Sequence, residues 1–350
     1  MTAEVQTTIY VALQGDLAAL RDSATAVSAQ IEKERRHAGI PRRDLSPFAK
    51  GEGGIPYAFT FDSGHAGPHV LVTSLAHGNE PGGLEAVVTL LERGIRPKIG
   101  RLSLAICNVA AHAATNGLDP YGTRFIAEDF NRVWDDAILD SDRHSVELDR
   151  ARQLRPLIAS ADVLLDLHAT PYEATPYFVL KPGSRAAALA DRIGQPHTRF
   201  VFNTGSVHSP TLTNYNQFSD PTGKAVGLTV ECGLFFARSS ADVALSAIGK
   251  LLAVQGLISE ETAASLTVWR DASPRRLITV EETQTVQTAD VRLLSRPGDF
   301  VAYTKGEIAA FDGETPLRAP FEGALPLWVK QTFVAGDTAF MWARQSLERQ

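Results

Sequence analysis

A histidine and a glutamate lie three residues apart at a point where an apolar segment gives way to glycines. The segment reads TSLAHGNEPGG over residues 73–83, and the pair is His77 and Glu80. A run rich in Val and Leu precedes the pair, and apolar residues at helical spacing follow it. The pair is therefore predicted to occupy a strand-to-helix turn, which is where ligands bind in open α/β sheets. A metal and a phosphate are both candidate ligands for such a turn.

A further histidine closes a second apolar run. The run DVLLDLHAT places His168 at the end of a predicted strand. A catalytic zinc commonly has three protein ligands of the histidine and carboxylate type, with an open fourth position for water. A lone histidine beside a glutamate is more often a structural hydrogen-bonded pair, but the addition of His168 favours a zinc site built from several strand ends. Asp166 would share a face with His168, either as its support or as a buried structural residue.

A carboxylate that can accept a proton ends another apolar run, GLTVECG. This residue is Glu231. Burying its charge between Val230 and Cys232 would be costly unless it had a partner or a chemical role. The alternative is an ordinary exposed residue at a strand edge.

The segment GTRFIAEDFNRVWDD carries several hydrogen-bond donors in a predicted loop, namely Arg124, Asn131 and Arg132. A guanidinium is a planar fork suited to carboxylates, and its fixed charge can stabilise a developing oxyanion. Surface ion pairing is the alternative, and the acidic residues available for it in the segment are Glu128, Asp129, Asp135 and Asp136.

The motifs HGNE, RFIAEDFNR, DLHAT and VECG, in this order, resemble those of the aspartoacylase and succinylglutamate desuccinylase family, a branch of the zinc carboxypeptidase-like hydrolases. The resemblance covers roughly residues 68–240, and the β-rich C-terminus is similar to the second domain of that family. Four linked motifs are far more specific than any one of them.

The resemblance implies a role for each of the residues singled out above. The family's zinc ligands, which hold one zinc ion per chain, fall on His77, Glu80 and His168. Its catalytic glutamate falls on Glu231, and the arginine that polarises the scissile carbonyl falls on Arg124. The pair that holds the substrate, commonly through a carboxylate, falls on Asn131 and Arg132.

The implied activity is the zinc-dependent hydrolysis of the amide bond of a small N-acyl amino acid. Zinc lowers the pKa of its bound water to about 7, and Glu231 would take the proton and later deliver it to the leaving amine. Arg124 would stabilise the oxyanion of the tetrahedral intermediate. The acyl group and the amine stay undefined, because the residues of the specificity pocket cannot be placed.

Three other functions are alternatives to the deacylase activity. A zinc carboxypeptidase acting on short peptides uses similar ligands, but the second domain of the resembled family narrows the entrance and favours small N-acyl amino acids. A non-catalytic metal-binding protein would not need both Glu231 and Arg124. The C-terminal segments also resemble lipoyl or biotinyl carrier domains in their Gly-Asp turns, but the hairpin DGETP has no lysine to modify.

The elements that must position these residues alternate between strand-like and helical patterns from about residue 52 to 265. This alternation predicts an α/β fold with a mostly parallel or mixed sheet flanked by helices. Later in the chain, short β-type runs separated by Gly- and Pro-containing turns predict a smaller all-β domain. The predicted division is an N-terminal helical extension at 1–50, a zinc hydrolase α/β domain at 51–268 and a C-terminal β domain at 269–350.

The N-terminal extension contains an amphipathic pattern over residues 16–36. Asp16 is a plausible helix cap, and the apolar positions are Leu17, Leu20, Ala24, Val27 and Ile31. Packing of this helix against its own domain is favoured over dimerisation, because the pattern is too short for a convincing coiled coil. A homo-oligomer is left open.

The composition narrows the classes of partner. The chain has 350 residues and a net charge of -6, and it contains no long Lys/Arg block, so nucleic acid is not an expected partner. Its first residues show no basic region followed by an apolar core, and it contains no run of about 18 apolar residues that would span a membrane, so a cytoplasmic location without a membrane partner is expected. The small-molecule substrate is what the family resemblance implies. The chain's two cysteines, Cys107 and Cys232, are expected to be buried free thiols.

Overall fold

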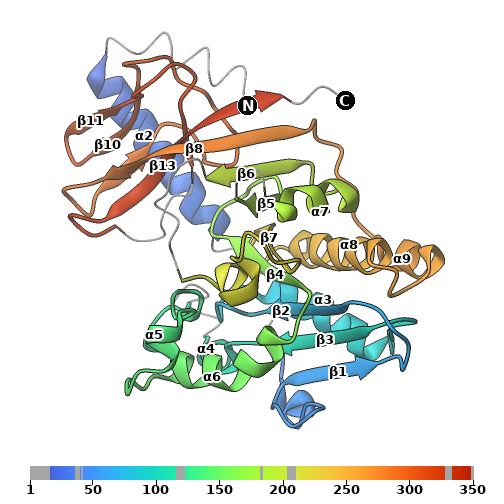
Figure 1. Ribbon diagram of the computed structural model, residues 1–350. Coiled ribbons are helices and arrows are strands. Elements are labelled where there is room, and N and C mark those ends of the chain that lie inside the picture. The colour runs from blue at the N-terminus through green and yellow to red at the C-terminus, as the bar shows by residue number, and fades with distance from the viewer. Residues whose placement is uncertain are drawn as a thin grey trace.

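A mixed sheet runs through most of the protein (Figure 1). The computed structural model describes residues 16–35, 40, 42–115, 123–181, 184–202, 210–327 and 333–347. Within these residues, ten strands form the sheet in the order β1-β3-β2-β4-β7-β5-β6-β8-β13-β12. In that order their bounds are Ala58–Asp62, Arg101–Ile106, His69–Ser74, Val163–Thr170, Val226–Leu234, Tyr177–Leu180, Thr198–Phe202, Arg276–Thr285, Thr338–Leu347 and Leu325–Leu327.

The centre of the sheet is parallel. Strand β2 pairs in parallel with β3 and β4, and β4 pairs in parallel with β7, so these four strands end at the same edge. Strand β5 is antiparallel to β7, which makes the sheet mixed. The predicted α/β fold with a mostly parallel or mixed sheet is therefore confirmed.

Helices cover both faces of the sheet, which explains why the central strands read as continuous apolar runs. One face packs against α3 (Pro81–Glu92), α7 (Arg185–Ile193), α8 (Arg238–Val254) and α9 (Glu260–Leu266). The other face packs against α6 (Val146–Ala159). The remaining short elements are α4 (Val109–Ala114), α5 (Asp136–Leu139) and the 3₁₀ turns η1 (Ser46–Phe48), η2 (Phe130–Arg132), η3 (Leu212–Asn214) and η4 (Asn216–Phe218).

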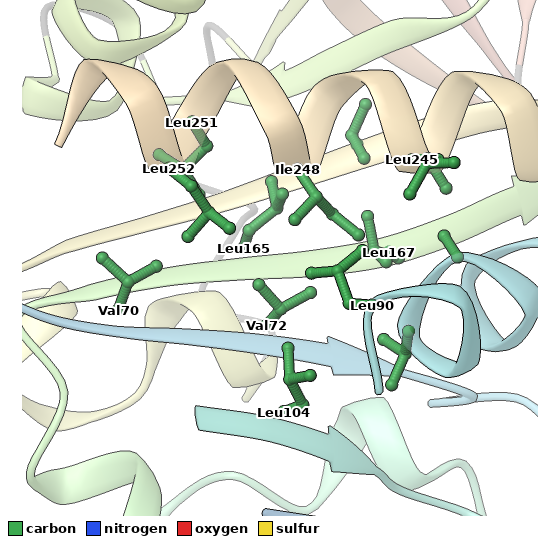
Figure 2. Close-up of a cluster of buried hydrophobic side chains, with 14 of the residues drawn as sticks. Val70, Val72, Leu90, Leu104, Leu165, Leu167, Leu245, Ile248, Leu251 and Leu252 are labelled. Carbon is green, nitrogen blue, oxygen red and sulfur yellow. The ribbon is translucent and has the colours of Figure 1, made fainter. Parts of the chain in front are cut away.

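Alternate residues of each central strand belong to different hydrophobic clusters. In β2, Val70 and Val72 lie in the cluster that contains α8, whereas Leu71 lies in the cluster that contains α6. Figure 2 shows Val72 and Leu165 of neighbouring strands beneath the side chains of α8. Successive side chains point to opposite faces of a strand, so both faces of this sheet are buried.

The C-terminal strands divide between two sheets. Strands β9 (Val291–Leu293), β10 (Ile308–Asp312) and β11 (Thr315–Arg318) form a small antiparallel sheet, as expected for a smaller β-rich part. Strands β8, β13 and β12 instead extend the main sheet, because β8 pairs with β6 and leaves that strand without an open edge. The domain limits drawn at 50 and 268 stay predictions.

The N-terminal helix α2 (Leu17–Arg35) packs against the C-terminal part of the chain. Its predicted cap is confirmed, because the Asp16 carboxylate accepts hydrogen bonds from the second and third backbone N–H groups that follow it. The apolar positions from Leu20 to Ile31 are buried in one cluster with Ile308 and Trp342. Helix α2 lies beside β9 and β10, and Figure 1 shows it next to β10. The helix therefore contributes to a core that residues near the other end of the chain complete.

Both cysteines are buried and unpaired, as predicted. Burial raises the pKa of the Cys107 and Cys232 thiols well above the ordinary value, so neither is a reactive thiolate at neutral pH. Of the helices in the described ranges, none is both long and apolar enough to cross a membrane.

Candidate metal centre and active site

The turn after β2 begins the site. Leu75 has a positive φ of 54°, which turns the chain sharply beyond the strand. The turn closes where the backbone N–H of Glu80 donates to the carbonyl of His77. Helix α3 then starts with Pro81 as its first residue, a position where the missing N–H of proline costs nothing. The predicted strand-to-helix turn is therefore present, and it holds both side chains at the sheet edge.

Two further strands bring their side chains to the same edge. His168 and Glu231 are register partners on β4 and β7, and Thr73 and Asp166 are register partners on β2 and β4. Register partners on neighbouring strands point to the same face, so these side chains all lie on the side of the sheet that α6 covers. Glu231 is buried with 8% of its surface exposed, so it is not the exposed edge residue considered as an alternative.

Three of the converging side chains form a compact donor set. His77, Glu80 and His168 each offer one ligand atom, and these atoms lie within 4.8 Å of one another. The carboxylate of Glu80 is central, with Oε1 at 2.8 Å from His77 Nδ1 and Oε2 at 3.2 Å from His168 Nδ1. All three residues are buried. Two imidazoles and one carboxylate are the ligand types of catalytic zinc sites.

The second nitrogen of each imidazole is held by a separate carboxylate. His77 Nε2 lies 3.0 Å from Asp129 Oδ1, and His168 Nε2 lies 2.7 Å from Asp166 Oδ2. The other oxygen of Asp166 accepts a hydrogen bond of 2.7 Å from the Thr73 hydroxyl. With a proton on each Nε2, both Nδ1 lone pairs are available to a metal, which is the usual arrangement of histidine ligands and their supporting carboxylates. The donor set therefore fits a zinc ion.

Neighbouring groups of opposite charge shift the pKa values of the carboxylate and of one imidazole in the donor set. Burial alone would raise the pKa of Glu80, but the neighbouring His77 and His168 hold it well below the usual range. Burial would lower the pKa of His168, but the carboxylates of Asp166 and Glu80 raise it. The ligand set thus contains a strongly ionised carboxylate in a dry environment, where a divalent cation is favoured electrostatically.

Glu231 stands apart from this ligand set. Burial raises its pKa to about 8, and its Oε2 is buried and has no hydrogen-bond partner among the described residues. A carboxyl group that binds and releases a proton near neutral pH suits general acid–base catalysis. The unused oxygen leaves one acceptor available for a proton of a ligand in the site.

The loop between α4 and α5 supplies the remaining candidates. Arg124 Nη1 donates to Glu80 Oε1 at 3.1 Å, and its Nε lies 3.6 Å from Asp129 Oδ2. Asn131 is buried, with Nδ2 at 3.4 Å from His168 Nε2, while its Oδ1 accepts from the backbone N–H of Leu212. Arg124 and Asn131 therefore adjoin the ligand set, and Asn131 also joins η2 to η3.

Arg132 follows Asn131 in η2. The residue as a whole is exposed, but burial lowers the pKa of its guanidinium, and the nearby Asp129 carboxylate partly offsets this effect. Its Nη1 donates to the carbonyl of the preceding Asn131, and it forms no close ion pair with any residue in the described ranges. The two residues before it in η2, Phe130 and Asn131, are buried.

Two acidic residues of this segment pair with arginines outside it. Glu128 pairs with Arg143 at 2.7 Å, and Asp136 pairs with Arg155 at 2.8 Å, both near the surface. Asp129 bonds His77 within the site and also pairs with Arg124 at 3.6 Å, so one ion pair of the kind given as the alternative is present. The sequence predicts Asp129 only as a partner for arginine, and no local signal distinguishes it from its acidic neighbours.

The comparisons with known proteins agree with this geometry. Residues 66–247, about half of the chain, match the family model described as the succinylglutamate desuccinylase/aspartoacylase catalytic domain. The chain belongs to this family. The match includes His77, Glu80, His168 and Glu231, and the protein is accordingly an enzyme of the succinylglutamate desuccinylase and aspartoacylase family.

Relatives extend the likeness beyond the catalytic domain. A succinylglutamate desuccinylase from Vibrio vulnificus is 26% identical over 292 residues, which cover 77% of this chain and 79% of that protein. A putative succinylglutamate desuccinylase/aspartoacylase family protein from Shewanella amazonensis has a TM-score of 0.61 at 17% identity, covering 84% of this chain and 95% of that one. The product-bound ectoine utilization protein EutE from Ruegeria pomeroyi has a TM-score of 0.56 at 18% identity, covering 80% and 86%. These matches therefore cover more of the chain than the catalytic-domain model does.

Proposed function

We propose that the protein is a zinc-dependent deacylase that hydrolyses the amide bond of a small N-acyl amino acid. The observation that carries the proposal is the pairing of the buried His77, Glu80 and His168 set with Glu231 on the adjacent strand. A protein that only stored or bound a metal would have no use for a buried carboxyl group with an unbonded oxygen beside the donor set.

The proposed ligands are His77, Glu80 and His168, one zinc ion per chain. Zinc bound there would act as a Lewis acid that lowers the pKa of a coordinated water to about 7. Glu231 would accept the proton of the attacking water on its free oxygen and return it to the nitrogen of the leaving amine.

Arg124 is proposed to stabilise the oxyanion. Its guanidinium bonds Glu80 at 3.1 Å, so its positive charge lies beside the proposed ligand set. The side chain is about one-third exposed, with a relative accessibility of 34%, so it can exchange this bond for one to a substrate oxygen. A fixed donor aimed at a developing negative charge typically contributes on the order of 100- to 1000-fold in turnover.

Arg132 is proposed to bind the carboxylate of the substrate. The Asp129 carboxylate interacts electrostatically with Arg132 but bonds His77, and Asp135 caps α5 by accepting from the Ala137 N–H. A guanidinium without a close ion pair among the described residues keeps its N–H donors available for bidentate recognition of an anion. This supports an N-acyl amino acid with a free carboxylate as the substrate class.

A hydrolysis screen tests the proposal. Purified protein, loaded with zinc, is offered N-acetyl, N-succinyl and N-formyl amino acids and a short unacylated peptide, and the release of free amine is measured with and without a chelator. We expect release from at least one acylated amino acid, abolition by the chelator, and little release from the peptide. Preferential cleavage of the peptide would instead assign a carboxypeptidase, and release unaffected by the chelator would exclude zinc chemistry.

A further inference from the structure

Glu147 is a completely buried carboxylate outside the set of residues that the proposed chemistry uses. It lies in the first turn of α6 and has a relative accessibility of 0%. No residue in the described ranges forms an ion pair with it. An isolated buried charge is costly, so the structure must satisfy this carboxylate in another way.

Backbone N–H groups of the site loop satisfy it. Its Oε1 accepts from the N–H of Ile126 at 2.7 Å, and its Oε2 accepts from the N–H groups of Ala127 and Glu128 at 3.1 and 3.3 Å. The Asn108 side-chain amide donates a fourth hydrogen bond to Oε1 at 3.1 Å. Three consecutive N–H groups that point at one carboxylate form a concave anion-binding segment, here occupied by a side chain of the same protein.

These three N–H groups belong to the loop that carries the site. Arg124 precedes them and bonds Glu80, whereas Asp129 follows them and bonds His77. Residues 126–128 lie outside any helix or strand, so no regular secondary structure orders their backbone. Glu147 is the side chain that takes up their hydrogen-bonding capacity, and it thereby fixes the stretch between two groups that touch the ligand set.

The same carboxylate is linked to the turn after β2. Asn108, which donates to Glu147, also caps α4 by accepting from the Ala111 N–H at 3.2 Å. The backbone N–H of Asn108 donates to the carbonyl of Leu75, two residues before His77. One buried acid therefore connects α6, the start of α4 and the loop, on the same side of the sheet edge as the donor set.

We propose that Glu147 is a positioning residue of the active site, whose carboxylate anchors the backbone of residues 126–128 and so sets Arg124 and Asp129 against Glu80 and His77. Glu147 contacts none of the proposed ligands and takes no part in proton transfer. The consequence for turnover rests on the proposed function, but the anchoring of the loop does not.

The test compares Glu147→Ala and Glu147→Gln with a matched control, Asp149→Asn. Asp149 is in the same helical turn, but its carboxylate is half-exposed and bonds His144 and Arg152 instead of the loop. Amide hydrogen exchange is measured by mass spectrometry on the zinc-loaded proteins, for peptides covering 123–132 and for peptides covering β2, β4 and β7. Zinc content, kcat and KM are measured on the same samples.

We expect the amides of residues 126–128 to exchange on the order of tenfold faster in Glu147→Ala, with β4 and β7 unchanged. The exchange rate of these amides in Glu147→Gln should lie between the rates in Glu147→Ala and in the wild type. The glutamine side chain has a single carbonyl oxygen, which replaces only part of the acceptor set, and its NH₂ group faces backbone donors. In Glu147→Ala, turnover should fall about 10- to 100-fold, because Arg124 is displaced and Asp129 holds His77 less firmly. Asp149→Asn should match the wild type in every measurement.

Unchanged exchange at 123–132 in both variants would overturn the proposal. Exchange raised equally in the loop and in β2, β4 and β7 would also overturn it, because that result describes a general loss of stability. If Glu147→Ala does not fold, Glu147→Gln decides between these outcomes. If the wild type hydrolyses no N-acyl amino acid, the proposed function fails, while the exchange result still decides whether Glu147 anchors the loop.

Discussion

His168 and Glu231 are register partners on the parallel strands β4 and β7, and their side chains leave the same face of the sheet. The pairing places a proposed metal ligand beside the proposed proton acceptor without any contribution from a flexible loop. Each residue ends an apolar run whose other side chains are buried in the two clusters flanking the sheet. Sites built on strands in this way are held more precisely than sites built on loops.

Removal of a proposed histidine ligand should remove the metal and the activity together. We expect one zinc per chain in the wild type and a loss of zinc in His77→Ala and His168→Ala, because two remaining donors bind zinc far more weakly than three. Elemental analysis of the purified proteins measures this. His144→Ala is the control, since His144 is exposed and its ion pair among the described residues is with Asp149. Two metals per chain, or none after reconstitution with zinc, would contradict the assignment.

Glu231→Gln should keep the metal and the fold but lose most of the turnover. The amide cannot accept a proton, and the contribution of a positioned general base is about 100- to 10,000-fold. The measurements are kcat on the best substrate of the screen, zinc content and circular dichroism. The same substitution at Glu128, whose carboxylate pairs with Arg143 near the surface, serves as the control. Turnover close to the wild-type value in Glu231→Gln would show that another group is the base.

Arg132→Lys should raise KM and leave kcat nearly unchanged. Lysine keeps the charge but loses the planar fork that bonds a carboxylate through two parallel hydrogen bonds. The wild type should accordingly hydrolyse an N-acyl amino acid much better than its carboxamide analogue, and the variant should narrow that difference. Steady-state kinetics on the two substrates measure both effects. Equal kcat/KM values for acid and carboxamide in the wild type would point to a neutral substrate.

Gly298→Ala should destabilise the contact between the C-terminal part and the segment that follows β4. Gly298 forms a backbone bridge with Ala174, and an added Cβ would lie 1.9 Å from the carbonyl oxygen of Glu173. Because backbone rather than a flexible side chain is in the way, the cost should be about 1–3 kcal/mol in the free energy of unfolding.

Urea denaturation measures the effect of this substitution. Gly223→Ala is its matched control, because the three atoms nearest to an added Cβ there belong to the Asp220 side chain, the nearest at 3.2 Å, and no backbone atom lies closer. An unfolding free energy equal to that of the wild type in Gly298→Ala would mean that the bridge is absent in solution.

The sequence by itself determined the local features of this protein. The Asp16 cap, the helix at 17–35, the apolar strands and the turn that holds His77 and Glu80 follow from the spacing and type of neighbouring residues. Such signals are local, since caps, periodicity and proline at a helix start act within a few residues. The four linked motifs also identified the family, because their order along the chain is itself specific.

The tertiary structure alone decided which distant groups meet. Asp129 reaches His77 across 52 positions of sequence, and Glu147 reaches back to residues 126–128, yet neither acid differs in type or spacing from neighbours that pair with arginines at the surface. The same is true of α2, whose apolar stripe predicts a buried face but not that C-terminal residues cover it. The approach of Arg132 to Asp129 is likewise a result of the tertiary structure. Contacts of this kind arise from the packing of the whole chain, because a hydrogen bond needs only proximity and orientation in space, and neither is encoded in local spacing.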